Sequence, residues 1–247
     1  IYVCVKQVPD TEARVQIGED GRSIETRDIN FILNPYDEFA VEQALLTREA
    51  LGGEVTALSL GEDNAAAAIR TAMAMGVDRG IHLRTVQPAF DPLTVARAIA
   101  REIGGKGVDV VFFGKQAVGN QHGQVGILVA ELLGIPAISD VSRLNVSAGG
   151  AEGEREVEGG TESFECPLPA MFTCQKGLNQ PRYPSLKGRM AARTKPLEVR
   201  EITLEAGQLE IEALGYPPQR ERGRMVGEGK AAVAELVRLL REEAKVI

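Results

Sequence analysis

Short apolar runs alternate with segments of helical periodicity along residues 1–140. Apolar, β-branched runs bounded by turn residues predict strands, and longer stretches with apolar residues three and four apart predict helices. Strands are expected at 1–8, 54–61, 79–84 and 108–114, a hairpin at 14–26, and helices at 34–53, 62–76, 91–105 and the second half of 110–134. Because strands and helices alternate, the pattern predicts an α/β fold with a doubly wound, mainly parallel sheet.

The helix expected at 34–53 has clear start and stop signals. Asn34 can cap its first turn, and Pro35 occupies the first helical position. Two acidic residues, Asp37 and Glu38, favour the positive end of the helix dipole. A pair of glycines ends the helix, as is common just beyond a C-terminus.

The pattern changes after residue 138, where the parallel core of residues 1–140 ends. Residues 141–177 alternate short apolar runs with Gly turns and predict a strand extension of the same domain. Residues 178–200 combine prolines and basic residues with little periodicity, which predicts a long loop, and such loops are commonly functional or disordered. Residues 201–247 are expected to form a tether and a C-terminal helix. One face of that helix collects Ala232, Val233, Leu236, Leu239 and Leu240.

Composition excludes several classes of protein. The 247 residues carry a formal net charge of −7, so we expect no nucleic-acid binding. No apolar run approaches the roughly 18 residues that span a membrane, and we expect neither membrane embedding nor a secretory signal. The cysteines lack CxxC spacing and are expected to be reduced core or near-core residues in a cytosol-like compartment. They are Cys4, Cys166 and Cys174.

Four glycines lie in and after the strand expected at 108–114, before the next helix begins. They are Gly114, Gly119, Gly123 and Gly126. Ligands of doubly wound sheets bind beyond the carboxyl ends of the strands, where this loop is expected. Glycines there allow backbone N–H groups to approach an anion at a helix N-terminus. The spacing matches neither the dinucleotide nor the P-loop fingerprint, so a phosphate site and a plain turn both stay open.

Catalytic chemistry is not evident elsewhere in the sequence. His82 lies on an expected strand and is interpreted as structural, whereas His122 lies in the glycine loop and can approach a phosphate. No triad partner for His122 and no metal-ligand spacing are evident. The acidic stretch 152–165 is interpreted as solvated strand faces. These observations predict a binding role, with no catalytic residues and no metal.

Six segments in register resemble the small (beta) subunit of electron transfer flavoproteins, from residue 1 to the C-terminal helix. They are KQVPD, NPYDEFAVEQAL, AIRTAMAMGVDRGIHL, VVFFGKQAVGNQHGQVG, VEGGTESFECPLPAMFTC and NQPRYPSLKGRMAARTKPLEV. The resemblance implies an adenine-nucleotide-binding, Rossmann-like domain. It also implies a heterodimer in which a larger alpha subunit holds most of the FAD, and the C-terminal helix packs on that subunit.

The resemblance further implies a buried AMP in this chain, and an aromatic residue, Tyr36, that approaches the flavin. The implied cofactor-binding residues are Cys4, Asn34, Pro35, Tyr36, Asp37, Leu60, Gly114, Gln116, Gly119, Asn120, Gly123, Gln124 and Val125. Of these, residues 123–125 would supply donors to the phosphate. The family moves electrons from flavin dehydrogenases, such as acyl-CoA dehydrogenases in fatty acid β-oxidation, to a membrane quinone oxidoreductase. It acts as a carrier without catalytic residues of its own.

The glycine loop departs from the family pattern. Relatives usually carry Asp where this chain has Gly119 and Gln121, and Thr where it has His122. The change removes negative charge beside a phosphate and adds a possible cation. Bifurcating relatives bind a second FAD where others bind AMP, so AMP and FAD both stay open as the ligand.

Residues 178–200 match the family's recognition loop, which docks on the dehydrogenase. Leu186 occupies the anchor position, and the surrounding cations, including Arg182 and Arg193, would steer the loop toward an acidic partner. The alternative is a solvated basic loop whose Leu186 folds onto its own domain. The implied docking residues are Tyr183, Leu186, Lys187, Arg189 and Met190.

Two other functions compete with the electron carrier. A nucleotide-hydrolysing or adenylating enzyme of this sheet class needs a Ser-Gly-Gly loop after the first strand, where this chain has KQVPDTE. A stand-alone adenine-nucleotide-binding protein leaves the basic loop and the terminal helix unexplained. The electron carrier is therefore favoured, in the bacterial cytoplasm or, in a eukaryote, the mitochondrial matrix.

Overall fold

The computed structural model describes residues 1–87, 90–219 and 223–247. The chain forms two compact units, Ile1–Glu212 and Ala213–Ile247. The first unit contains the sheet and its helices, and the second contains a terminal helix.

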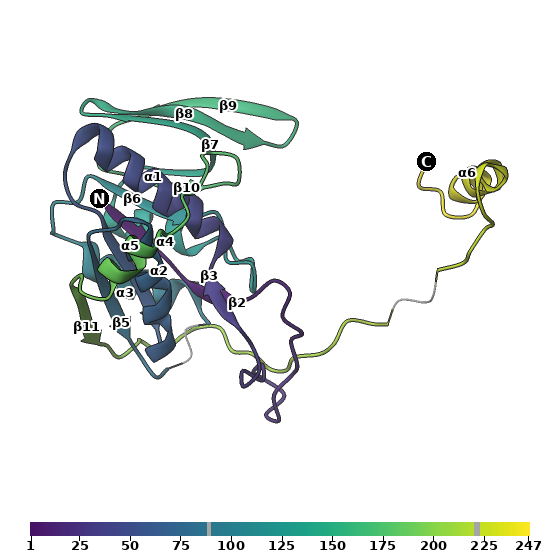
Figure 1. Ribbon diagram of the computed structural model, residues 1–247, viewed down its shortest axis with the longest axis horizontal. Helices are drawn as coiled ribbons and strands as arrows, with labels where there is room; N and C mark the ends of the chain where they lie inside the picture. Colours follow the sequence, from purple (N-terminus) through teal and green to yellow (C-terminus); the bar gives the residue numbers. More distant parts are fainter. Residues whose placement is uncertain (88–89, 220–222) are drawn as a thin grey trace. The chain divides into compact units, whose positions relative to one another are not determined.

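A nine-stranded sheet forms the centre of the first unit (Figure 1). Adjacent strands from β11 to β7 are parallel, whereas β7, β8 and β9 form an antiparallel extension. The predicted parallel α/β sheet with a strand extension is thereby confirmed. In order across the sheet the strands are β11 (Leu197–Glu201), β5 (Arg79–Arg84), β4 (Thr56–Gly61), β1 (Tyr2–Cys4), β6 (Val110–Gly114), β10 (Ala170–Cys174), β7 (Ala137–Ser147), β8 (Gly150–Val157) and β9 (Gly160–Cys166).

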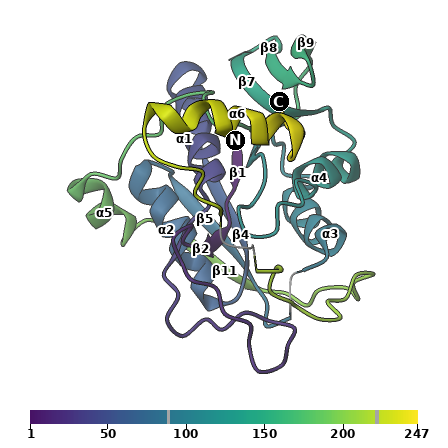
Figure 2. The same cartoon turned by 90° about the vertical axis from the view of Figure 1, so that its right-hand side faces the viewer.

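Two apolar cores lie on the opposite faces of the sheet, because successive strand residues point to opposite sides. Val3 and Phe112 belong to the core with α1 and α2, and their neighbours Cys4 and Phe113 belong to the core with α3 and α4. Figure 2 shows the two helix pairs on either side of the strands, which makes the sheet doubly wound. The helices are α1 (Pro35–Leu51), α2 (Ala66–Met75), α3 (Pro92–Ile103) and α4 (Val125–Leu133).

The predicted helix boundaries are confirmed to within a few residues. Pro35 is the first residue of α1, and the helix ends before Gly52. A 3-10 turn (Asp63–Ala65) precedes α2, which ends at Gly76. His82 is buried, and its Nε2 lies 3.1 Å from the carbonyl oxygen of Gly61, as expected of a structural histidine.

The N-terminal segment differs from the prediction. Instead of one strand over 1–8, it forms β1 and then β2 (Gln7–Pro9), which pairs antiparallel with β3 (Phe31–Leu33) in a separate sheet. The hairpin expected at 14–26 reduces to a single bridge between Ile17 and Ile24. The alternation is real but too short and exposed to sustain a ladder.

Residues 178–200 are more ordered than the predicted loop. They contain α5 (Leu186–Ala192), whose first turn Ser185 caps by accepting a hydrogen bond from the Gly188 N–H at 3.0 Å. They also contain most of β11, which pairs parallel with β5 at the edge of the sheet. Charged pairs such as Arg79–Glu198 join these two strands. A strand that pairs with another more than a hundred residues away gives no local signal of the pairing.

Residues 201–212 also belong to the first unit, although we expected a tether from residue 201. Leu204 is buried, and its N–H donates to the Gln87 side chain at 2.5 Å. The N–H of Gln208 donates to Asp91 at 2.6 Å. These contacts fasten the segment beside the start of α3, so the boundary between the units falls at residue 213.

The acidic stretch in β8 and β9 forms solvated strand faces, as expected. Its carboxylates interact across neighbouring strands. Glu162 of β9 forms a salt bridge with Arg155 of β8, and Glu152 of β8 accepts a hydrogen bond from Asn145 of β7. Such cross-strand pairs account for the charges without a catalytic role.

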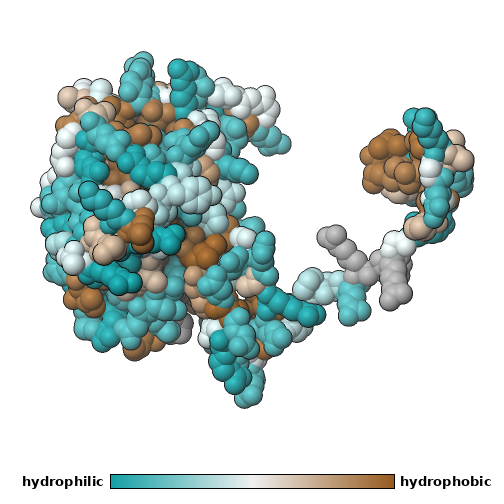
Figure 3. Space-filling view, viewed as in Figure 1, coloured by the Kyte–Doolittle hydropathy of each residue, from teal (hydrophilic) through white to brown (hydrophobic). Residues whose placement is uncertain are grey.

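The second unit is an irregular segment followed by a 3-10 turn (Lys230–Ala232) and α6 (Val233–Glu242). Arg238 pairs with Glu235 and Glu242 on the polar side of α6. Figure 3 shows apolar side chains gathered along the other side of this helix, and Val233, Leu236 and Val237 are all exposed. Among the described residues, no helix is long and apolar enough to cross a membrane.

Candidate functional site

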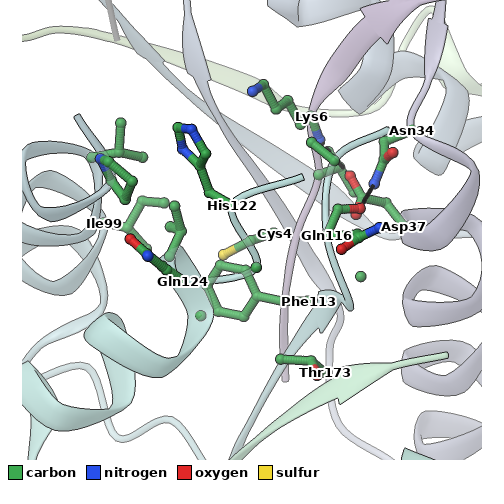
Figure 4. Close-up of a pocket in the computed structure, with 18 of the residues that line it drawn as sticks. Cys4, Lys6, Asn34, Asp37, Ile99, Phe113, Gln116, His122, Gln124 and Thr173 are labelled. Carbon is green, nitrogen blue, oxygen red and sulfur yellow. Dashed lines mark hydrogen bonds between the residues drawn. The ribbon is translucent and has the colours of Figure 1, made fainter. Parts of the chain in front are cut away.

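A pocket opens at the carboxyl ends of β1, β4 and β6, at the edge where ligands of doubly wound sheets bind (Figure 4). One wall comes from the residues after β1 and the first turn of α1, and the other comes from α3 and the start of α4. Its apolar side chains include Leu58, Val95, Ile99 and Phe113. These side chains give the pocket walls that suit a flat ring, and its polar groups gather around the loop after β6.

Asn34 connects helix α1 to the loop after β6. We expected its side chain to cap α1, and this expectation is wrong: the side chain makes no capping hydrogen bond. Its Nδ2 instead donates to Asp37 Oδ1 at 2.8 Å and to the Gln116 carbonyl at 2.9 Å, and its Oδ1 accepts from the Val118 N–H at 3.1 Å. The buried amide is satisfied by the loop, so it fixes the loop's position.

Asp37 is a buried carboxyl group in the first turn of α1. Its oxygens accept hydrogen bonds from the Lys6 N–H at 2.7 Å and from Asn34, and the Gly114 N–H also donates to it. Burial raises the pKa of Asp37 to about 7, although these donors act in the opposite direction. The same burial lowers the pKa of Lys6 and, with the Asp37 charge, raises that of the Cys4 thiol.

The four glycines in and around the glycine loop serve different purposes. A Cβ at Gly114 would collide with Asp37 and lie 2.7 Å from the Tyr36 carbonyl carbon, so only glycine lets β6 meet α1. Gly123 has a φ of +61°, in the left-handed region. A Cβ added to Gly126 would lie 3.1 Å from the Phe113 ring, so this glycine allows close packing. Gly119 has open space and no positive φ. Close packing and one left-handed turn therefore explain three of the four.

The N-terminus of α4 faces the pocket. Gln124, Val125 and Gly126 line it, and the Gln124 side chain makes no capping hydrogen bond. The first N–H groups of a helix have no partner inside the helix. The end of α4 can therefore donate hydrogen bonds to an anion in the pocket, assisted by the helix dipole.

Lys6 and His122 lie on one side of the pocket. Figure 4 shows them together, with Thr173 on the opposite side. The His122 ring packs edge to face against Phe90 at 5.3 Å. A second lysine of the pocket, Lys115, is paired with Asp140 at 2.6 Å. Among the described residues, Lys6 makes no salt bridge of this kind, although the Asp37 carboxyl group nearby raises its pKa against the effect of burial.

The pocket brings together most of the cofactor-binding residues implied by the sequence. Those that line it are Cys4, Asn34, Asp37, Leu60, Gly114, Gln116, Asn120, Gly123, Gln124 and Val125. Pro35, Tyr36 and Gly119 do not line it. The sequence reasoning did not single out the apolar walls or Lys6. Lys6 could have been predicted, because it lies two residues after Cys4, which was itself implied as a cofactor-binding residue. The walls come from helix faces whose apolar pattern is that of an ordinary core.

A separate exposed surface lies on and before α5. Tyr183 is 95% exposed, Leu186 78% and Met190 65%. Leu186 is therefore not folded onto its own domain. Arg182, counted above among the steering cations, is instead bound to Glu42 and Glu49.

The fold and the pocket define a doubly wound α/β protein with a pocket at the carboxyl edge of its sheet, lined by apolar side chains, by Lys6 and His122, and by the N-terminus of α4. The family model of the electron transfer flavoprotein domain matches residues 22–205. The chain is 37% identical, over its full length and 99% of the relative's, to electron transfer flavoprotein subunit beta of Bacillus subtilis. It is equally identical, with the same coverage, to the mitochondrial beta subunit of Arabidopsis thaliana, and 35% identical over 95% of both chains to that of Mus musculus.

The chain therefore belongs to the electron transfer flavoprotein family, among the beta subunits. These matches confirm the family resemblance drawn from the sequence. The proteins of this family are electron carriers associated with flavin.

Proposed function

We propose that this chain is the beta subunit of a heterodimeric electron transfer flavoprotein. With an alpha subunit that holds most of the FAD, it carries electrons from flavin dehydrogenases, such as acyl-CoA dehydrogenases, to a membrane quinone oxidoreductase. The observation that carries the proposal is the pocket itself. It joins a helix N-terminus, the Lys6 and His122 side chains and apolar walls. Among its described lining residues, no nucleophile is hydrogen-bonded to a base, which favours binding over catalysis.

The ligand proposed for the pocket is AMP. Its phosphate would accept hydrogen bonds from the N–H groups of residues 123–125 and from the His122 ring, with Lys6 balancing its charge. Its adenine would lie against the apolar walls. Unlike the usual family loop, this one carries no carboxylate between Gly114 and Val125, so it offers the phosphate no repulsion. A second FAD in place of AMP is the alternative.

The ligand is identified by releasing it. The chain should be purified with and without the alpha subunit, denatured, and the supernatant analysed by chromatography and mass spectrometry. Near-stoichiometric AMP is expected in both samples, with FAD only in the heterodimer, so the isolated chain is colourless and the heterodimer yellow. FAD from the isolated chain would favour a bifurcating relative. If neither sample releases a nucleotide, the proposed site is wrong.

The exposed surface on and before α5 is proposed to dock the dehydrogenase. Tyr183, Leu186 and Met190 supply an apolar patch, and Lys187 and Arg189 surround it with positive charge. An apolar anchor ringed by charges suits an acidic partner, because desolvation of the anchor gives affinity and the charges speed encounter. The protein is proposed to be located in the bacterial cytoplasm or, in a eukaryote, in the mitochondrial matrix.

A further inference from the structure

The docking segment, defined here as residues 179–195, is tied to the body of the domain near both ends. At its start, Asn179 Nδ2 donates to the Phe39 carbonyl at 3.0 Å and to Gln43 Oε1 at 3.2 Å. Both acceptors belong to α1, the helix whose first turn lines the pocket. The segment therefore leaves the sheet with the Asn179 side chain already held against α1.

Arg182 makes the strongest tie. Its backbone N–H donates to Glu42 Oε2 at 3.0 Å, and its guanidinium donates to both oxygens of the same carboxylate at 2.8 and 2.9 Å. The outer side of the guanidinium also reaches Glu49 Oε1 at 2.7 Å. A forked, charge-assisted arrangement of this kind fixes both side-chain and backbone position.

Glu42 and Glu49 differ sharply in environment. The Glu42 side chain is only 6% exposed, whereas that of Glu49 is 47% exposed. An ion pair at the surface contributes little, because water competes for both partners. If the buried carboxylate lost its charge, the guanidinium would lose its main partner. Glu42 therefore contributes more than Glu49 to holding Arg182 in place.

The far end of the docking segment is held by α2. Lys195 Nζ donates to the carbonyls of Met73 and Val77 at 3.0 and 2.6 Å, and Arg70 donates to the carbonyls of Ala192 and Lys195. Gly188 seats α5 directly against the Ala74 carbonyl, with no room for a side chain. Cation-to-carbonyl bonds at this end and the Arg182 tie at the other leave little freedom between them.

The three exposed apolar residues of the docking surface lie between these two ends. We infer that Glu42 is a positioning residue for docking: through Arg182 it holds Tyr183, Leu186 and Met190 in a preformed arrangement that a dehydrogenase can bind without first ordering the segment. The inference rests on the proposed docking function. Preorganisation of this kind improves affinity because less conformational freedom is lost on binding.

The variants that test it are Glu42→Gln, Glu49→Gln and Leu186→Ala, each in the intact heterodimer. Glu42→Gln keeps the shape of the buried side chain and removes its charge. Glu49→Gln is the matched control, because it removes the surface partner and leaves the three hydrogen bonds to Glu42. Leu186→Ala removes the anchor without touching the tie. Arg182→Lys, which keeps the charge but loses the fork, replaces Glu42→Gln if that variant does not fold.

The first measurement is limited trypsin digestion of the native heterodimer, followed by mass spectrometry. Cleavage after Lys187, Arg189 and Arg193 reports how often the segment opens. Glu42→Gln should raise the cleavage rate at these three sites about tenfold, while Glu49→Gln and Leu186→Ala stay within about twofold of the parent. Equal cleavage of the parent and of Glu42→Gln would overturn the inference, since the tie would then not hold the segment.

The second measurement is reduction of the heterodimer by an acyl-CoA dehydrogenase and its acyl-CoA substrate. Glu42→Gln should raise the KM for the heterodimer about tenfold and leave kcat and nucleotide content near the parent's, a split that general destabilisation would not produce. If Leu186→Ala raises KM but Glu42→Gln does not, the inference fails and the docking surface stands. If Leu186→Ala leaves KM unchanged, or the parent is not reduced, the proposed docking function fails, and the inference with it.

Discussion

Gly114, the last residue of β6, packs directly against Asp37 in the first turn of α1. A Cβ added to Gly114 would lie 2.8 Å from the Asp37 backbone nitrogen, and backbone atoms cannot rotate away. Gly114→Ala should therefore destabilise the chain by about 1–3 kcal/mol and lower its nucleotide content. A thermal melt and the amount of nucleotide released on denaturation measure the two effects.

Gly119→Ala is the matched control for this substitution in the same loop. Gly119 has neither a close neighbour nor a positive φ, so alanine should change stability by less than about 1 kcal/mol. Similar melting temperatures for the two variants would show that close packing at Gly114 does not shape the pocket.

Asp37 should make stability depend on pH. Its pKa is raised in the folded chain to about 7 from an ordinary value of 3.8, chiefly by burial. The folded state therefore binds more protons than the unfolded state between those values, so stability falls as pH rises from about 4 to about 7, by at most about 4 kcal/mol. Urea unfolding across this range should show the fall in the parent and a flatter profile in Asp37→Asn.

Asp63→Asn provides the control for the pH experiment, because Asp63 is an exposed partner of Arg84. It should keep the parent's pH profile. Parallel profiles for Asp37→Asn and the parent would mean that the folded and unfolded states hold the Asp37 proton equally well.

Sequence periodicity predicts the elements of this fold that are local. The α1 boundaries follow from Pro35 and Gly52, and the parallel sheet follows from the alternation of strands and helices. The pairing of β11 with β5 and of β2 with β3 could not be predicted in this way. Each joins short segments that are distant in sequence, and nothing in either segment alone specifies its partner.

The candidate site shows the same division. The family resemblance indicated residues on the polar side of the pocket, with Asn34 in the turn before α1 and Gln124 in the glycine loop. The apolar side, with Ile99 and Val95 on the inner face of α3, has the same spacing as any core helix. The Asn34 side chain was assigned to a helix cap because capping is a local rule, whereas two of its three partners lie 82 and 84 residues away.

Tyr36 is half-buried in the first turn of α1 and does not line the pocket, so its ring is free to serve a different contact. If that contact is the flavin, Tyr36→Ala should shift the flavin absorption spectrum or potential of the heterodimer. AMP content should stay unchanged, and Tyr36→Phe should retain most of the parent's spectrum. A variant that loses stability without a spectral change would identify Tyr36 as ordinary packing.

The terminal unit is expected to serve the heterodimer rather than the fold of the first unit. Among the described residues, Leu239 is the one buried apolar residue after position 212, while Val233 and Leu236 are exposed. A chain that ends at Glu212 should keep its melting temperature within a few degrees, because its core is complete, but bind the alpha subunit at least tenfold more weakly. Calorimetry with purified alpha subunit measures this, and undiminished affinity would contradict it.

Leu186 and its neighbouring cations should make separable contributions to docking. Leu186 is 78% exposed, so Leu186→Ala should change stability by no more than about 0.5 kcal/mol. Because Leu186 acts as a desolvated anchor, the substitution should nevertheless lower the affinity for a partner dehydrogenase on the order of thirtyfold, or roughly 2 kcal/mol.

Arg189→Gln should mainly slow association, and its effect should shrink as salt is raised, because surface charges act through a screened field. Stopped-flow reduction of the heterodimer at several ionic strengths separates the two effects. Loss of many degrees in melting temperature for Leu186→Ala, or a salt-independent effect of Arg189→Gln, would show that these side chains support packing and not docking.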